Sequence, residues 1–246
     1  MYWISDRTGR FPRRPYYSTD DLDALCEDRI RRFLSRQHGR IAYPISTDDL
    51  MVLLEQDADD LDLCADLAPL GGAGVVVEGV TTFVPGGRPR VQIERRLVED
   101  TRRETRLRTT LTHEEGHVLL HAFVGRREAS TQLPLLFDAA DPALTVAPTT
   151  AQCAPEEALG KRRVSWMEWQ AGYACGALLM PRTALGDLRG ALGLSAPIPL
   201  QRREADRLIQ AVRTRFLVSE AAARVRLLQV GYLTETPPPP TLFDAP

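Results

Sequence analysis

The stretch TLTHEEGHVLLH, residues 110–121, decides the fold of this 246-residue chain. It lies inside a run with helical spacing from about 99 to 123, which predicts one long helix. Residues four apart on a helix are rotated by about 400° and therefore lie on the same face. The imidazoles of His113 and His117 can thus converge on one metal ion.

Glu114 is adjacent to the first of these histidines, so its carboxylate can reach a water molecule at the metal without taking a coordination position. Two histidine ligands, a carboxylate base and an open position for water are the arrangement of zinc hydrolases. The spacing therefore predicts a Zn²⁺ site with His113 and His117 as ligands and Glu114 as the general base.

A catalytic zinc ion usually has three protein ligands, so the pattern requires one more. His121 lies on the same predicted helix, roughly 12 Å from His113 at 1.5 Å per residue, which is too far for the three histidines to share one ion. The metzincin pattern requires His at 123 and Gly at 120, where this chain has Phe123 and Leu120. We interpret His121 as a structural residue or as one that orients a ligand through a hydrogen bond.

Glu168 is the other candidate for the third ligand, on a helix predicted from about 165 to 180. An acidic residue on a helix is usually solvated surface. Here a buried, unpaired carboxylate would be costly, and a metal ion would supply its partner. The neighbours that make this helix apolar are Trp166, Trp169, Ala171, Ala174, Cys175, Ala177, Leu178 and Leu179.

The segments before the motif predict a mainly helical α+β fold. Helical spacing covers about 18–37 and 46–58, each run beginning at a serine that can cap a helix. Three β-type runs follow at 75–77, 81–84 and 91–93, separated by turn-forming Gly and Pro residues. They predict a small antiparallel three-stranded sheet next to the motif helix, and a strand at 91–94 that pairs with an extended substrate.

Composition shifts divide the chain into four parts. Residues 1–17, rich in Arg, Pro and Tyr, predict an irregular arm, and residues 18–199 form the main domain, in which the Pro-rich stretch 129–163 predicts a long loop. The segment 196–199 reads as a linker to a C-terminal helical pair at 200–234. Residues 235–246, with four consecutive prolines, predict an exposed tail.

Charge and cysteine usage exclude several classes of protein. Lys plus Arg number 31 against 33 Asp plus Glu, a net charge of −2, so no basic excess indicates nucleic-acid or anionic-membrane binding. No apolar run is long enough to cross a bilayer or to act as a signal peptide, so we expect a cytoplasmic protein with no membrane partner. The cysteines lack the spacing of a disulfide framework or a thiolate zinc site. They are Cys26, Cys64, Cys153 and Cys175.

Residues 202–232 carry the main alternative. This segment contains seven arginines and three acidic residues. It predicts two helices joined by a short turn, which is typical of a helix-turn-helix. Direct DNA binding is therefore one reading of this pair. The reading we favour is a pair that packs on the main domain or contacts a protein, because charged helix faces are usually solvated and the chain is slightly acidic.

Two linked motifs resemble the ImmA/IrrE family of zinc metallopeptidases. Residues 110–121 are similar to the family's TLAHELGHLLLH, and EWQA at 168–171 with LLMP at 178–181 is similar to its EWQAN-x-FA-x-x-LLMP. The resemblance covers roughly 20–235 and implies a zincin-like fold, zinc ligands His113, His117 and Glu168, and Glu114 as general base. Two positions depart from the family pattern. The family usually has Asn or Asp where this chain has Gly172, and Phe where this chain has Ala174.

The resemblance also implies a function. Characterised members are cytoplasmic proteases that cleave a helix-turn-helix repressor and so regulate transcription. The expected partner is therefore a protein substrate, and the sequence gives no oligomeric state. The alternatives are a DNA- or protein-binding regulator with an inactive peptidase domain, and the toxin of a toxin–antitoxin pair. Tyr173 and Arg182 are candidates for a second oxyanion donor, with a structural role as the other reading of each.

Overall fold

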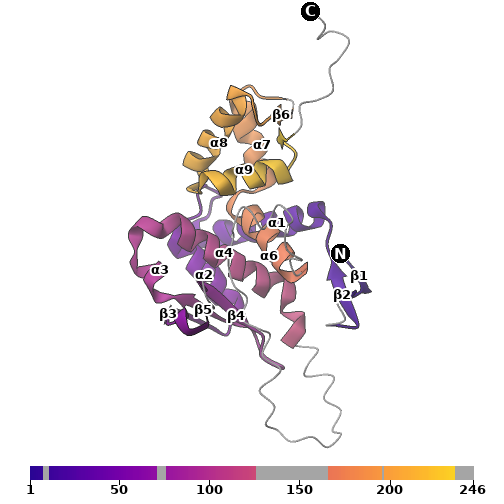
Figure 1. Ribbon diagram of the computed structural model, residues 1–246, viewed down its shortest axis with the longest axis vertical. Helices are drawn as coiled ribbons and strands as arrows, with labels where there is room; N and C mark the ends of the chain where they lie inside the picture. The colour runs from indigo at the N-terminus through magenta and orange to yellow at the C-terminus, as the bar shows by residue number, and fades with distance from the viewer. Residues whose placement is uncertain (8–10, 71–75, 126–165, 196, 236–246) are drawn as a thin grey trace, which may run out of the picture.

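The computed structural model describes residues 1–7, 11–70, 76–125, 166–195 and 197–235 as a mixed α+β protein that is mainly helical (Figure 1). The helices are α1 (Thr19–His38), α2 (Thr47–Asp57), α3 (Arg95–Glu99), α4 (Glu104–His121), α6 (Trp166–Leu179), α7 (Arg182–Ala191), α8 (Arg203–Phe216) and α9 (Glu220–Gln229). The strands are β1 (Tyr2–Ser5), β2 (Arg13–Tyr16), β3 (Asp60–Ala65), β4 (Gly79–Thr82), β5 (Arg90–Glu94), β6 (Ile198–Pro199) and β7 (Leu233–Thr234). The predicted loop at 129–163 lies outside these ranges, as does nearly all of the predicted tail.

Helix α4 lies at the centre of the molecule, where it packs against α6, α2 and β4 (Figure 1). Its first predicted residues, from 99 to 103, belong instead to the end of the short helix α3 and a 3₁₀ turn. The ends of the other helices follow local chemistry: Ser18 caps α1 through a reciprocal capping box, and Gly39 ends it at φ 68°. Every helix that carries a candidate site residue therefore touches the main core.

The sheet differs from the predicted antiparallel meander. Its order is β3-β5-β4, with β4 antiparallel and β3 parallel to the central strand β5. Val76 and Val77 are not in a strand, and the missed strand is DLDLCA at Asp60–Ala65. That segment alternates polar and apolar residues, which is a strand signal, but it follows a poorly marked helix end. Propensity alone misplaced the strand, because β structure depends on what the side chains pack against.

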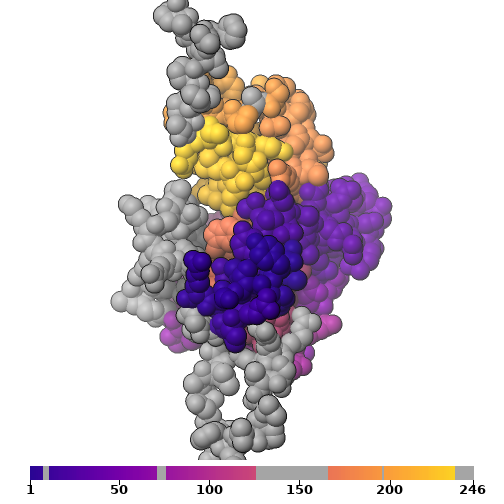
Figure 2. Space-filling view, turned by 90° about the vertical axis from the view of Figure 1, so that its right-hand side faces the viewer, coloured from indigo at the N-terminus to yellow at the C-terminus, as the bar shows by residue number. Residues whose placement is uncertain are grey.

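The predicted irregular arm at 1–17 is also wrong. β1 and β2 form an antiparallel pair in which Tyr2 is opposite Tyr16 and Trp3 is opposite Pro15. Figure 2 shows this N-terminal region, in indigo, on the face turned toward the viewer. The segment lacks apolar periodicity, and its aromatic residues pack in pairs instead: Trp3 makes an edge contact with Phe123, and Tyr2 packs on Tyr16.

At the C-terminal end, α8 and α9 occupy the range of the predicted helical pair, joined at Leu217 with φ 52°. The segment predicted as a linker contains β6, which pairs in parallel with β7. Figure 1 shows α7, α8 and α9 together in the upper part of the molecule. Buried residues of α8 and α9 belong to the same hydrophobic cluster as those of α1, α4 and α6, so one continuous core includes the pair.

Two buried arginines tie the C-terminal helices to the rest of the protein. Arg226 of α9 donates to Asp23 of α1 at 2.6 Å and to the Met180 carbonyl at 3.1 Å. Arg108 of α4 donates to the carbonyls of Phe216 and Leu217, both at 3.2 Å, where α8 ends. Each arginine is 1% exposed. Buried charges of this kind are stable only when paired, so α9 and α8 are held in fixed positions against the main domain.

No helix among the described residues is both long enough and apolar enough to cross a membrane.

Candidate metal centre

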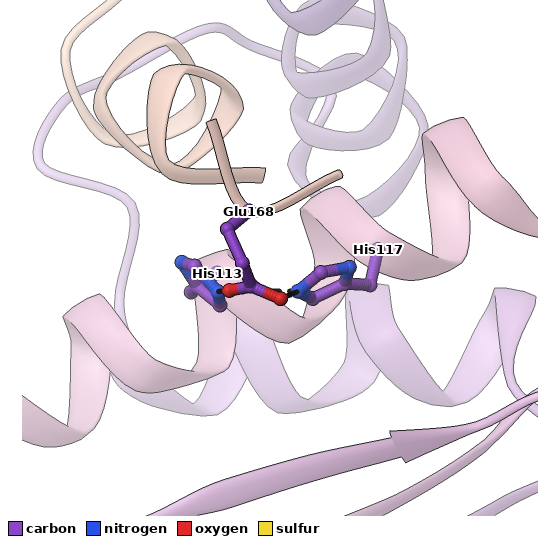
Figure 3. Close-up of side chains that lie close together, drawn as sticks. All are labelled: His113, His117 and Glu168. Atoms are coloured by element: carbon purple, nitrogen blue, oxygen red, sulfur yellow. Dashed lines mark hydrogen bonds and ion pairs between the residues drawn. The ribbon is translucent and has the colours of Figure 1, made fainter. Parts of the chain in front are cut away.

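His113, His117 and Glu168 converge between α4 and α6 (Figure 3). The Nε2 atom of His113 lies 3.2 Å from Oε2 of Glu168, and the Nε2 atom of His117 lies 3.5 Å from Oε1. The two Nε2 atoms are 3.2 Å apart, and the three possible ligand atoms lie within 4.8 Å of one another. The structure thus brings together all three residues that the sequence nominates as ligands.

The close approach of α4 and α6 depends on Gly116, within the histidine motif. A Cβ atom at this position would lie 3.0 Å from both Cα and the carbonyl oxygen of Ala171 and 3.2 Å from Cβ of Ala174. These distances are tighter than ordinary van der Waals contact, and two of the atoms are backbone. The missing side chain of Gly116 and the small one of Ala174 therefore let α6 approach closely enough for Glu168 to reach the histidines.

The donor set fits a divalent metal such as Zn²⁺, which takes imidazole nitrogen and carboxylate oxygen ligands. Burial by itself raises the pKa of Glu168, but hydrogen bonds and the charges of His113 and His117 outweigh it and hold the pKa well below its usual range. Both histidines are buried, with exposures of 4% and 0%. An ionised carboxylate and two imidazoles in so small a space are a donor set that could hold a cation.

Glu114 lies next to this group, packed between α4 and β4, and is fully buried. Its Oε2 atom accepts a hydrogen bond of 2.6 Å from the Thr81 hydroxyl, while Oε1 has no partner among the described residues. Burial raises the pKa of the Glu114 carboxyl, and His117 and His113 oppose that rise. A carboxylate with one oxygen anchored and the other without a partner is suited to accept a proton.

A hydrogen-bond chain extends from His117 to the N-terminal strands. Nδ1 of His117 lies 3.1 Å from Nδ1 of His121, whose Nε2 lies 3.0 Å from Oε1 of Gln170. The Gln170 amide nitrogen donates to the Pro15 carbonyl at 3.3 Å. His121 therefore contacts a candidate ligand, as expected for a residue that orients a ligand through a hydrogen bond.

The direction of every hydrogen bond in this chain follows from its last member. The Pro15 carbonyl can only accept, so Gln170 presents its NH₂ group there and its carbonyl oxygen to His121. His121 Nε2 therefore carries a hydrogen, and its Nδ1 is the acceptor, because burial lowers the pKa of His121 to about 3 and keeps the ring neutral. Nδ1 of His117 is then the donor, which leaves a lone pair on Nε2, toward His113 and Glu168.

Replacing Gln170 with Ala is expected to weaken metal binding by about 10–100-fold, because it removes the group that fixes this tautomer. Metal affinity would be measured by competition with a chelator. Gln210→Ala, on the exposed surface of α8, is the control and should bind metal like the parent protein. Equal affinities in the two variants would show that the chain does not orient His117.

Other candidate residues lie elsewhere. The Tyr173 hydroxyl donates to Asp23 at 3.2 Å and Arg182 pairs with Asp20 at 2.7 Å, so neither candidate oxyanion donor is directed at the histidines. The strand predicted to pair with a substrate is also wrong, because β5 is paired on both sides and the edge strands of this sheet are β3 and β4. Cys26, Cys64 and Cys175 form no disulfide bond among the described residues, and Cys153 lies outside them.

Sequence reasoning missed Gly79, Thr81, Gln170 and Pro15 as members of the site. Gly79 is one of the glycines between the predicted β-type runs, and the structure places it in β4, where a Cβ atom would lie 2.6 Å from Oε1 of Glu114. Gln170 is inside the second motif, which was a signal that could have drawn attention to it. The contribution of Pro15 carried no local signal, because only the tertiary fold brings its carbonyl to α6.

No protein-family model matches the chain, and a search of curated proteins finds no similar sequence.

Proposed function

We propose that the protein is a zinc-dependent endopeptidase with a zincin-like fold. The observation that carries the proposal is the convergence of His113, His117 and Glu168 beside a buried carboxylate, Glu114, that has one oxygen without a partner. A Zn²⁺ ion held by the three residues would supply Lewis acidity, which polarises a carbonyl group and makes a water molecule more acidic.

The residues of the chain supply the proton transfers and the position of the substrate. Oε1 of Glu114 accepts the proton of the attacking water and later delivers it to the leaving amine, while Thr81 holds the other carboxylate oxygen in place. β4, the edge strand beside α4, offers its outer edge to an extended peptide by β-augmentation. This replaces the pairing with β5 that the sequence suggested.

The proposed substrate is a helix-turn-helix repressor in the cytoplasm, as the resemblance to the ImmA/IrrE family implies. A toxin role would use the same site on another target. Several contacts make the DNA-binding alternative less favoured: in the C-terminal pair Arg226 is buried against Asp23, Arg213 lies 3.5 Å from Glu220, and Arg215 donates to the Tyr43 carbonyl. Three of the seven arginines of the pair are therefore engaged within the protein.

Metal analysis of the purified protein tests the proposal. We expect about one zinc per chain, a marked loss of zinc in His113→Ala, and no change in the control His38→Ala, whose ring contacts Asp49. Where the neighbouring gene encodes a helix-turn-helix repressor, the loaded protein should cleave that repressor. Metal-free protein that binds duplex DNA in a salt-sensitive way would support the regulator instead.

Replacing Gly79 with Ala is expected to lower hydrolysis by about 10²-fold while zinc binding is retained, because the new Cβ would displace Oε1 of Glu114. Steady-state cleavage and zinc content would be measured together. Gly172→Ala is the matched control, since a Cβ at 172 meets no atom within 4 Å. The same open space means that the Asn or Asp usual in the family would fit there. Full activity in Gly79→Ala would contradict the position assigned to the base.

A further inference from the structure

A cavity of about 350 Å³ lies between the N-terminal strands and the first turns of α6. Figure 2 shows the two segments next to each other, the N-terminal residues in indigo and α6 in salmon. The side chains that define its chemistry are Arg7, Arg14, Tyr16, Trp166, Trp169 and Gln170. Its volume is at the lower end of the range of ligand pockets, about 300–1,000 Å³, and suits one or two side chains rather than a helix.

The cavity has positive charge without a matching partner. Neither Arg7 nor Arg14 lies within ion-pair distance of a carboxylate among the described residues. The Arg14 guanidinium lies over the Trp166 ring, with its Cζ atom 5.2 Å from the ring centroid, so the two side chains form a cation–π contact in the cavity wall. Asp6 also lines the cavity, but one of its oxygens accepts from the Phe11 amide at 3.1 Å. The cavity lining therefore contains two guanidinium groups and one carboxylate, and that carboxylate already accepts a hydrogen bond from the backbone.

Aromatic side chains form the rest of the wall, and Trp169 is 48% exposed although it is large and apolar. Tyr16 is exposed as well, at 37%. Exposed aromatic residues combined with arginine are the composition of binding hot spots, in which apolar walls exclude water and strengthen the charged contacts. The surface is thus suited to a partner group that is both anionic and attached to an apolar segment.

The cavity adjoins the candidate metal centre through α6. Gln170, which is 2% exposed, lines the cavity and contacts His121, and His121 in turn contacts the candidate ligand His117. The cavity and the candidate metal centre are thus linked by one buried hydrogen-bond chain.

We infer that this cavity binds an acidic side chain, Asp or Glu next to an aromatic or aliphatic residue, of the protein substrate. Arginine guanidinium groups match a carboxylate in geometry and charge, and the rings of Tyr16 and Trp169 receive the neighbouring apolar group. The inference rests on the proposed function for the identity of the partner as a substrate. Binding itself requires neither a metal ion nor Glu114.

The test uses intrinsic fluorescence of the full-length protein, because Trp166 and Trp169 are two of its three tryptophans. The probes are the capped peptides Ala-Phe-Glu-Phe-Ala and Ala-Phe-Gln-Phe-Ala, titrated at low salt. We expect the Glu peptide to change the fluorescence saturably and to bind at least about tenfold more tightly than the Gln peptide, as one charge-assisted hydrogen bond predicts.

Variants assign the preference to the cavity. Arg7→Gln with Arg14→Gln should bind the two peptides equally, whereas Arg32→Gln, which changes an exposed arginine on α1, should behave like the parent. Far-UV circular dichroism would confirm that each variant is folded, and Arg14→Lys provides a milder change with an intermediate preference.

Several results would overturn the inference: no binding of either peptide, equal binding by the parent protein, a preference that survives in the double variant, or displacement of the Glu peptide by inorganic phosphate at lower concentrations than by acetate. Glu114→Gln should keep the preference. Loss of hydrolysis with the peptide preference intact would count against the peptidase proposal and not against the cavity. Hydrolysis without any preference for the Glu peptide would count against the cavity and not against the peptidase proposal.

Discussion

Glu114→Gln is expected to reduce peptide hydrolysis by about 10²–10⁴-fold, the usual contribution of a general acid–base group. Glutamine has nearly the same shape and can keep the contact with the Thr81 hydroxyl, but it cannot accept and return a proton at the Oε1 position. The variant should therefore fold and bind zinc like the parent protein. Cleavage of a confirmed protein substrate, together with zinc content, would be measured on the same preparations.

The neighbouring glutamate supplies the matched control. Glu115 is also buried, but its Oε1 atom lies 3.5 Å from Nε of Arg29 on α1, on another side of α4. Burial raises the pKa of Glu115 to about 8, so at neutral pH its carboxyl is largely protonated and an amide is a close substitute. Glu115→Gln should retain hydrolysis. Comparable activity in both variants would remove Glu114 from the mechanism.

Asp23→Ala is expected to destabilise the fold by about 3–5 kcal/mol, because it leaves the Arg226 guanidinium buried without its counterion. The Tyr173 hydroxyl would lose its acceptor in the same change. Stability would be measured by urea denaturation, with the midpoint and slope both fitted.

Asp20→Ala is the control for that measurement. Asp20 forms an equally short ion pair with Arg182, but its side chain is 82% exposed, so its loss should cost only about 0–1 kcal/mol. Adding Arg226→Met to Asp23→Ala should recover part of the stability, since the unpaired charge is then gone. Equal losses in the two single variants would show that the contact between α9 and α1 contributes little.

The candidate centre divides into a part that local spacing predicts and a part that it does not. His113, Glu114 and His117 follow from the helical period alone, because all three lie within five residues. Glu168 required a second helix, and its apolar neighbours were the signal that a buried carboxylate needs a partner there. The order of the residues along α4 was therefore sufficient for the position of the histidines but not for their environment.

The rest depended on contacts between distant segments. β3 and β5 are parallel neighbours in the sheet, although β4 lies between them in the sequence. Nothing in the segment DLDLCA specifies β5 as its partner. Val76 has high β propensity but is 60% exposed in the fold, so its propensity did not decide its structure. Pro15 and Gln170 meet across 155 residues of chain, which no periodicity can encode.

The carbonyl of Pro15 has a practical meaning for anyone who wishes to transplant the centre. A minimal scaffold built from α4 and α6 would present His113, His117 and Glu168 with their spacing intact, yet the imidazole of His117 would be free to carry its hydrogen on either nitrogen. The smallest autonomous binding unit consequently includes the first strands of the chain, or a designed acceptor that stands in for a single backbone oxygen.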